Sequence, residues 1–303
     1  MVAKLHIDLD ALVANWRMIQ RRVEPAYAAA VVKADAYGLG AKQVATALSK
    51  AGCSRFYVAW AEEGAALRRE LGPAPEILVF HGVTSDTLDL FQMYALQPVL
   101  NHLEQIDLWA EANVQPRPAA LHIDTGMNRL GVSRAHWAAA ARMLPKPTRL
   151  ISHLACGDET SPANAAQLAR FTEAGALWPG VPASLSASGG VYLGKDYHFD
   201  EVRPGIALYG GRPAAGRPNP MAEVVRLRGG ILQVREIDAQ GSVGYGASHS
   251  VTPGSRIATV AVGYADGLPR AAGRPRMAML GGWQVPIIGR VSIDLFTDAA
   301  TTE

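Results

Sequence analysis

The sequence predicts an α/β fold in which a (β/α)8 TIM-type barrel is followed by a smaller all-β domain. Strand-like and helix-like segments alternate over the first 220 residues, as in parallel βαβ units, and eight such units close into a barrel. After residue 220 the helical pattern ends, and short β-runs separated by glycine and proline follow. We therefore predict a barrel over residues 1–220 and a β-domain over residues 221–303.

The first predicted element is a short alternating segment over residues 5–9, after which Asp10 is predicted to cap a helix. Apolar residues recur in that helix at helical spacing, at Leu12, Trp16 and Ile19. The eight predicted barrel strands are 27–33, 55–59, 76–80, 97–100, 119–124, 148–153, 183–188 and 205–209. Ala-rich amphipathic segments predict helices at 41–51, 61–71, 135–143 and 163–174.

The segment GRPAAGRPNP, residues 211–220, is rich in glycine and proline and is predicted to be a linker. The β-runs predicted after it are 224–238, 242–251, 256–262, 276–280 and 283–291. No internal repeat is visible, so the boundary near residue 220 divides two different kinds of domain.

Composition favours a globular protein that binds a small molecule. Hydrophobic residues make up 49% and charged residues 18%, and no apolar run approaches the length of about 20 residues that a membrane span needs. The 29 basic and 27 acidic residues are scattered along the sequence, so no cluster of basic residues indicates binding to nucleic acid or to a membrane. The N-terminus lacks an apolar export signal, so we expect a cytoplasmic protein. Cys53 and Cys156 have no metal-ligand spacing, so no metal site is expected.

The most informative segment is AVVKADAYGLG, residues 30–40. An apolar strand ends there at Lys33, and an amine at a strand end that is withdrawn from water loses its proton readily. Such an amine can form a Schiff base. The alternative is a surface lysine that only marks the strand end, and that is the commoner fate of a single lysine.

Other polar segments follow later strands at the same end of the predicted barrel. They are HIDTGMNRLG from residue 122, SHLACGDE from 152, SASGG from 186 and VRPGIALYGG from 202. Each signal alone is weak, because Arg129 and Arg203 can be surface residues and His153 can be a core histidine. Together with Lys33 and a glycine-rich anion cradle, they indicate a phosphorylated aldehyde cofactor.

The chain resembles the alanine racemases, pyridoxal-phosphate enzymes with an N-terminal barrel and a C-terminal β-domain. The motifs that carry the resemblance occur in the family's order over almost the whole chain: AVVKADAYG, DTGMNRLG, VRPGIALYGG, VGYGASHS, VAVGYADG and GRVSIDL. The resemblance implies pyridoxal 5'-phosphate on Lys33. It also implies that Lys33 and Tyr245 act as two bases on opposite faces of the substrate's α-carbon, an arrangement that racemisation requires.

The resemblance also implies roles for the remaining site residues. Arg203 would face the pyridine nitrogen, and His153 and Arg203 would support the phenolate of Tyr245. The phosphate would be bound by Tyr37, Ser188 and the amides of Gly205 and Ile206. Arg129 would lie near the cofactor's phenolic oxygen and the substrate carboxylate, which the backbone amide of Ile293 would also bind. Tyr264 and Asp294 would line the substrate entrance and the part of the site that faces the partner chain. In the family Tyr245 reaches the cofactor of a partner chain, so a homodimer is implied. Read without the family, Tyr245 and Tyr264 can equally be aromatic residues that pack at an interface.

Three departures from the family pattern stand out. His122 occupies a position where the family commonly has a lysine that orients the neighbouring arginine, and Ile293 replaces a methionine. The chain ends at Glu303, whereas the family continues for some tens of residues and contributes a further phosphate-binding tyrosine. The sequence is therefore either a naturally short member or a fragment, and both readings stay open.

The expected activity is the interconversion of L- and D-alanine, which supplies D-alanine for cell-wall peptidoglycan. One alternative is a racemase of broader specificity, for example toward serine or a basic amino acid. The other is a non-catalytic pyridoxal-phosphate-binding protein whose site the shortened second domain leaves incomplete.

Overall fold

The computed structural model describes residues 3–112, 118–270 and 276–299. The chain folds into two compact units, of which one comprises Ile7–Val224 and the other combines the residues before Ile7 with those from Val225 onward. Strand β1 (Lys4–Ile7) pairs with β11 (Val225–Arg228), so the N-terminal segment does not join the barrel to which we assigned residues 1–220. The division at residue 225 lies just beyond the predicted linker.

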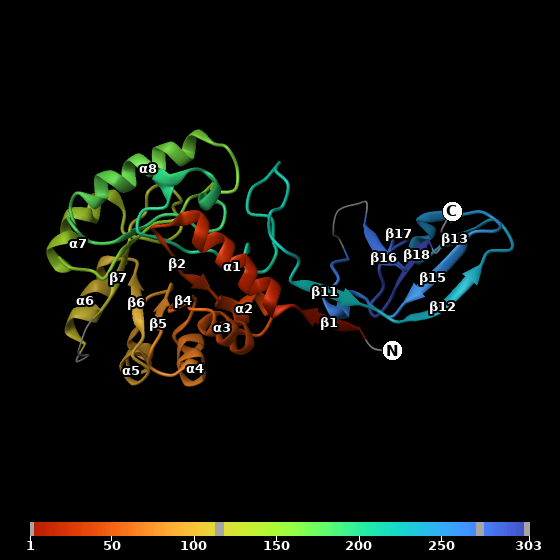
Figure 1. The fold of residues 1–303 in the computed structure, drawn as a ribbon, viewed down its shortest axis with the longest axis horizontal. Coiled ribbons are helices and arrows are strands. Elements are labelled where there is room, and N and C mark those ends of the chain that lie inside the picture. The colour runs from red at the N-terminus through yellow and green to blue at the C-terminus, as the bar shows by residue number, and fades with distance from the viewer. Residues whose placement is uncertain (1–2, 113–117, 271–275, 300–303) are drawn as a thin grey trace. The chain divides into compact units, whose positions relative to one another are not determined.

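The first unit is a parallel barrel surrounded by helices (Figure 1). Seven strands pair in chain order from β3 to β9, and β10 pairs with β2. The barrel strands are β2 (Tyr27–Ala28), β3 (Ala30–Val31), β4 (Arg55–Val58), β5 (Glu76–Val79), β6 (Gln97–Leu100), β7 (Ala120–His122), β8 (Leu150–Ile151), β9 (Ala183–Ser184) and β10 (Glu201–Val202). The predicted fold class is therefore correct.

The barrel closes at a strand that the sequence pattern misplaced. The amide of Arg203, just after β10, donates to the Ser186 carbonyl at 2.8 Å, and the Ala29 amide donates to the Val202 carbonyl at 2.9 Å. The strand predicted at 205–209 is instead a turn. Ala207, Leu208 and Tyr209 are buried there without strand pairing, and the Tyr209 hydroxyl donates to the Val31 carbonyl.

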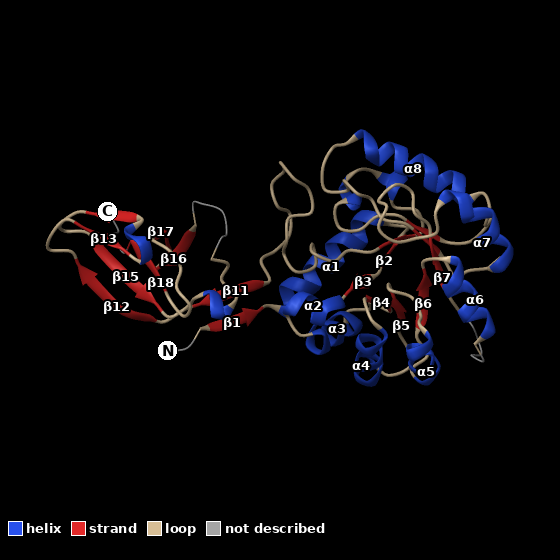
Figure 2. Cartoon of the chain, turned by 180° about the vertical axis from the view of Figure 1, so that it is seen from behind, coloured by secondary structure: helices blue, strands red, loops and turns tan. Residues whose placement is uncertain are grey.

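Helices cover the outside of the barrel, as the cartoon in Figure 2 shows. They are α1 (Leu9–Val23), α3 (Ala41–Lys50), α4 (Ala61–Leu71), α5 (Leu88–Met93), α6 (Leu103–Glu111), α7 (Trp137–Met143) and α8 (Pro162–Gly175). The segment labelled α2 (Lys33–Gly38) is a left-handed turn rather than a regular helix. The cap of α1 is Asp8 rather than the predicted Asp10, because Asp8 Oδ1 accepts from the Ala11 amide at 2.9 Å. Asp10 lies in the first turn, where its charge favours the helix dipole.

The barrel contains a partly buried ion network. Glu201 accepts from the Tyr57 hydroxyl and from the Arg55 guanidinium, while Arg55 and Arg149 both contact Glu76, at 2.9 and 2.7 Å. An apolar cluster of residues from β3 to β8 packs around the barrel axis. Because buried charges need partners, this network keeps the acidic and basic groups matched inside the barrel.

The second unit is built on an antiparallel sheet in the order β12-β15-β18-β17-β16. Its strands are β12 (Ile231–Glu236), β15 (Arg256–Val260), β16 (Met277–Leu280), β17 (Trp283–Ile288) and β18 (Phe296–Ala299), and a separate hairpin joins β13 (Gly241–Val243) to β14 (His249–Val251). The predicted runs 224–238 and 242–251 each contain two strands, and β18 was not predicted. The all-β character of this unit is as expected.

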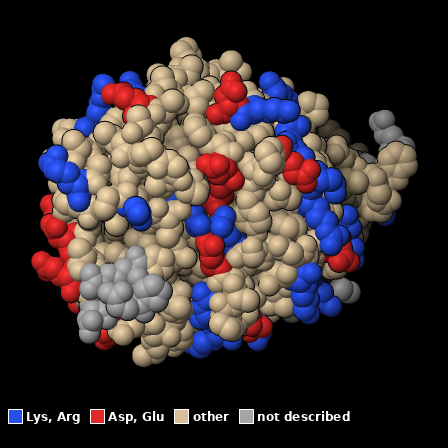
Figure 3. All heavy atoms as spheres, turned by 60° about the vertical axis from the view of Figure 1, so that its left-hand side comes forward, with Lys and Arg blue, Asp and Glu red and all other residues tan. Residues whose placement is uncertain are grey.

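The surface carries no single-sign patch on the face that Figure 3 shows, where basic and acidic side chains are interspersed. None of the helices in the described part of the chain has the length and apolar character that a bilayer-spanning helix needs. Within the same residues, no cluster of three His, Cys, Asp or Glu side chains is placed to share a metal ion.

Candidate active site

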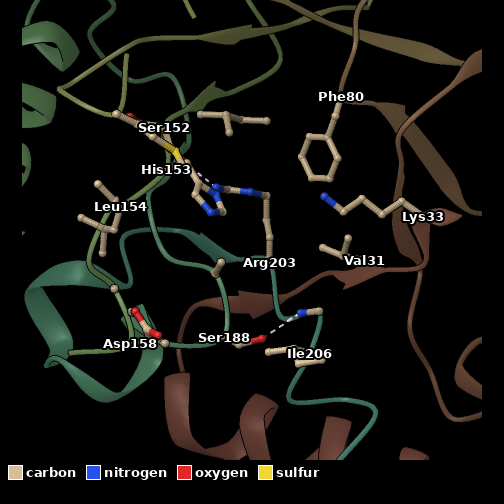
Figure 4. A pocket seen from close by; sticks show the side chains of 18 of the residues that line it. Val31, Lys33, Phe80, Ser152, His153, Leu154, Asp158, Ser188, Arg203 and Ile206 are labelled. Carbon is tan, nitrogen blue, oxygen red and sulfur yellow. Dashed lines mark hydrogen bonds between the residues drawn. The ribbon is translucent and has the colours of Figure 1, made fainter. Parts of the chain in front are cut away.

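A cavity of about 560 Å³ opens where the barrel strands end. It is lined by every residue to which the resemblance gave a cofactor-binding role: Lys33, Tyr37, Arg129, His153, Ser188, Arg203, Gly205 and Ile206. Figure 4 shows Lys33 and Phe80 beside Arg203 and His153, with Ser188, Ile206 and Asp158 toward the other end. The structure thus brings these residues together, and their individual roles stay predictions.

Lys33 begins a left-handed turn. The φ angles of Ala34, Asp35, Ala36 and Tyr37 lie between 51° and 59°, in a region that non-glycine residues rarely adopt. Tertiary hydrogen bonds hold this turn, because Glu63 Oε1 accepts from the Ala34 amide at 2.6 Å. The turn ends the β3 segment and directs Lys33 into the cavity.

The environment of Lys33 favours a neutral amine. Burial, followed by the positive charge of Arg129, lowers the pKa of Lys33, while Glu63 partly opposes this shift. Lys33 Nζ lies 5.8 Å from the centre of the Phe80 ring. A neutral amine is the form that attacks a carbonyl group.

Arg203 is held rigidly by neutral acceptors. Its guanidinium donates to the Ser184 carbonyl at 2.7 Å, to Ser184 Oγ and to the Ser152 carbonyl. Its side chain is buried, and a guanidinium stays protonated in such a site. Arg203 therefore presents a fixed cation on the floor of the cavity.

His122 is held as one tautomer. Because Asn101 Nδ2 donates to the carbonyls of Phe80 and Val99, Asn101 Oδ1 accepts from Nδ1–H of His122 at 2.8 Å. Nε2 of His122 is then an acceptor without a proton. Burial, and next the charge of Arg203, lowers the pKa of His122 to about 3. His122 is therefore a neutral hydrogen-bond acceptor in the wall of the cavity.

The opposite end of the cavity is built from backbone and hydroxyl groups. Ser188 Oγ accepts from the amides of Gly205, at 2.9 Å, and Ala207, at 3.2 Å. A Cβ on Gly205 would lie 2.1 Å from the Tyr37 hydroxyl, so only glycine fits there. In the described residues the Ile206 amide has no hydrogen-bond partner. This end offers hydroxyl and amide donors to an anion, although the Gly205 amide already donates to Ser188.

Three titratable residues that line the cavity were given no site role from the sequence: His81, Asp158 and Arg212. His81 follows β5 and lies edge-on to Trp60, with ring centres 4.1 Å apart. Its position one residue after a predicted strand was the only available signal. Arg212 belongs to the segment predicted as a linker. The glycine and proline content of that segment gave no sign that Arg212 lines the cavity.

The remaining predicted site residues belong to the second unit. Tyr264 and Ile293 are exposed and lie close together, because the Tyr264 amide donates to the Ser292 carbonyl at 3.0 Å. Tyr245, which is 68% exposed, lies in the short helix Tyr245–Ala247. Gly244 and Gly246, the two neighbours of Tyr245, both pack against Arg290. Ile293 and Asp294 follow in the same segment, 289–294, so these predicted site residues all lie within the second unit.

The two pocket histidines give a testable pH dependence. The pKa of both His122 and His153 is lowered to about 3, mainly by burial, from an ordinary value of 6.5. Between these values the unfolded chain binds more protons, so the free energy of unfolding should fall as pH drops below 6.5. We expect a loss of about 1–2 kcal/mol per histidine near pH 5. Urea unfolding of the cofactor-free protein at several pH values measures it.

His122→Gln and His153→Gln should each flatten this pH dependence. His136→Gln is the matched control, because that histidine is exposed and outside the cavity. Equal pH slopes in all three variants and the parent would show that the buried histidines do not cause the effect.

Comparisons with known proteins agree with this arrangement. Residues 7–213 match the family model "Alanine racemase, N-terminal domain", and residues 224–302 match "Alanine racemase, C-terminal domain". The alanine racemase of Rhodospirillum rubrum is 49% identical over 97% of this chain and 82% of its own length. That of Jannaschia sp. is 48% identical over 97% of this chain and 84% of its own length. The relatives are thus somewhat longer than this sequence.

Solved structures give the same result. The crystal structure of alanine racemase from Bartonella henselae, with covalently bound pyridoxal phosphate, has a TM-score of 0.91 and 36% identity over 99% of this chain and 86% of that chain. The biosynthetic alanine racemase of Pseudomonas aeruginosa has a TM-score of 0.91 and 34% identity, with coverage of 99% of this chain and 86% of that chain.

A parallel barrel with a half-buried lysine amine at the strand ends, followed by a β-unit, defines the class as a two-domain barrel enzyme. Both family models and the relatives agree on which one. The chain belongs to the alanine racemase family, a family of isomerases, and the resemblance predicted from the motifs is confirmed.

Proposed function

We propose that this protein is a pyridoxal-phosphate-dependent isomerase that interconverts L- and D-alanine. The observation that carries the proposal is Lys33, which presents an amine of lowered pKa inside a basic cavity of an alanine racemase fold. The Bartonella henselae relative, whose bound pyridoxal phosphate is covalent, supports a lysine-linked cofactor here.

The residues of the cavity fit this cofactor. Four basic side chains, Lys33, Arg129, Arg203 and Arg212, face one carboxylate, Asp158. The excess of positive charge suits an anionic cofactor together with an anionic substrate group. The absence of a side chain on Gly205 lets the Tyr37 hydroxyl approach the backbone there, since a Cβ would lie 2.1 Å from that oxygen.

We assign the cofactor contacts as the resemblance implies. Tyr37, Ser188 and the amides of Gly205 and Ile206 would hold the phosphate, and Arg203 would face the ring nitrogen. Because Arg203 keeps its proton, it would leave that nitrogen unprotonated. When bound, pyridoxal phosphate supplies an aldehyde that Lys33 can capture and a conjugated ring that stabilises negative charge at the substrate's α-carbon.

The chain's own residues would then move the protons. Lys33 Nζ would accept or donate a proton on one face of the α-carbon, and the Tyr245 hydroxyl would do so on the other face. His153 and Arg203 would supply the polar surroundings that favour the phenolate of Tyr245. Arg129 and the segment around Tyr264, Ile293 and Asp294 would orient the substrate, with the neutral Nε2 of His122 available to accept from Arg129.

We also propose a homodimer in which Tyr245 completes the site of the partner chain. The high exposure of Tyr245, Tyr264 and Ile293 is compatible with a contact to a second copy. The supply of D-alanine for peptidoglycan and the cytoplasmic location are proposed with the racemase activity, and they rest on the family resemblance.

The test is to supply purified protein with pyridoxal phosphate and to measure both the conversion of each alanine enantiomer and α-proton exchange in deuterated water. We expect both enantiomers to give the same equilibrium mixture. A panel that includes serine and basic amino acids tests broader specificity, which the His122 and Ile293 departures leave open. Tight cofactor binding without any α-proton exchange would instead favour a non-catalytic pyridoxal-phosphate-binding protein.

A further inference from the structure

The predicted linker, residues 211–220, forms part of the cavity wall. Arg212 and Pro213 both line the cavity, and Pro213 is buried. The segment is anchored to the barrel, because the Gly211 amide donates to the Ile206 carbonyl at 3.0 Å and the Ala215 amide donates to the Asp158 carbonyl at 2.7 Å. A free connection between domains would not need these contacts. The anchored segment therefore gives Arg212 a defined place.

The chain reaches Arg212 from the hydroxyl-and-amide end of the cavity, and Arg212 lines that cavity. Its neighbour Gly211 packs so closely on Ile206 that a Cβ there would come within 2.4 Å of the isoleucine side chain. Figure 4 shows Ser188, Ile206 and Asp158 at this end, away from Lys33 and Phe80. Arg212 directly follows the residue that contacts Ile206. The guanidinium of Arg203, by contrast, donates to the carbonyls of Ser152 and Ser184.

The charges at this end are unbalanced without Arg212. Tyr37, Ser188 and the Ile206 amide are neutral donors, and Asp158 contributes a negative charge to the lining. A phosphate group carries close to two negative charges near neutral pH and binds most strongly where a guanidinium can donate to it. Hydroxyl and amide donors beside a carboxylate would give such a ligand little charge compensation.

We infer that Arg212 is a phosphate-binding residue of this cavity, and that it supplies the positive charge that the neutral donors around Ser188 and Ile206 lack. This inference rests on the proposed function, since it takes pyridoxal phosphate as the ligand. Asp158 acts in the opposite sense and weakens the binding of the anion. The two residues together set how strongly the cavity prefers a phosphorylated ligand over its uncharged counterpart.

The experiment compares two ligands that differ only in the phosphate. Cofactor-free protein is titrated with pyridoxal phosphate and with pyridoxal, and the dissociation constants are obtained from fluorescence or equilibrium dialysis. Arg212→Gln should weaken binding of pyridoxal phosphate by about 5- to 10-fold and that of pyridoxal by less than about 2-fold. Asp158→Asn should instead strengthen binding of pyridoxal phosphate by about 2- to 3-fold.

Arg217→Gln is the matched control, since Arg217 is an exposed arginine of the same segment that does not line the cavity. It should change neither constant. Arg212 is itself exposed, so its replacement leaves the core intact, and unchanged thermal unfolding verifies this. Equal weakening of both ligands by Arg212→Gln, or no change in either, would overturn the assignment. Parent protein that binds neither ligand would refute the proposed function itself, which separates the two failures.

Discussion

Replacement of Lys33 by alanine is expected to reduce kcat/KM for alanine racemisation by at least ~10³-fold in both directions. Lys33→Ala removes the amine that captures the cofactor and, with it, one of the two proposed bases. The same variant should lose the visible absorbance of lysine-bound pyridoxal phosphate. Activity assays on each enantiomer and absorbance spectra after removal of free cofactor measure the two effects separately.

Lys42→Ala is the matched control for this variant. Lys42 lies nearby in the sequence, at the start of α3, but its amine is exposed and pairs with Glu70 at 2.8 Å. Its loss should leave activity and absorbance unchanged. If Lys33→Ala kept both the absorbance and a tenth of the activity, the role assigned to Lys33 would have to be abandoned.

The order of the barrel elements could be predicted because it depends on local patterns. Apolar runs marked the strands from β2 to β9, and helical spacing marked α3, α4 and α8 to within a few residues. The eighth strand could not be located in this way. The apolar run at 205–209 resembles a strand, but Pro204 precedes it, and the hydroxyl of the buried Tyr209 donates to the Val31 carbonyl. Burial by tertiary contact leaves the same pattern as burial in a sheet.

The sequence could predict which residues gather in the candidate site, but it could not predict the backbone conformation that positions them. Polar residues at strand ends meet at one end of a parallel barrel, so topology alone brings Lys33, Arg129 and Arg203 into one cavity. The left-handed turn after Lys33 had no local signal, because Ala34 and its neighbours are not glycine. Its geometry depends on Glu63, which is 29 residues away from Ala34.

The same limit applies to the predicted linker, because its composition did not show that it lines the cavity. Glycine and proline in residues 211–220 indicate a break in regular structure, and they do so correctly. They carry no information on where the irregular chain runs. Hydrogen bonds from Gly211 and Ala215 to the barrel determine that course, and both acceptors are backbone carbonyls that any sequence would offer. A polar residue in such a segment is recognised as part of a site only once the cavity is known.

Tyr245→Phe is the variant that tests the two-base arrangement. It removes the hydroxyl and keeps the ring, so packing within the second unit should change little. Interconversion of L- and D-alanine should fall by about 10²- to 10⁴-fold, because one face of the α-carbon loses its acid/base group. Lys33 remains in the variant, so one enantiomer should still exchange its α-proton with deuterated water, with retention of its configuration. The variant should therefore lose inversion of the α-carbon but keep α-proton exchange. A variant with a generally disrupted site would lose both.

Tyr94→Phe provides the comparison, because the Tyr94 hydroxyl accepts only an exposed bond from Arg69 in the described residues and lies outside the cavity. It should racemise alanine at the parent rate. Full activity of Tyr245→Phe in both directions would exclude Tyr245 as a base. Loss of exchange from both enantiomers would also contradict the arrangement, since Lys33 alone suffices to exchange a proton on its own face. Only retained exchange of a single enantiomer, with inversion lost, agrees with two different bases on opposite faces of one carbon.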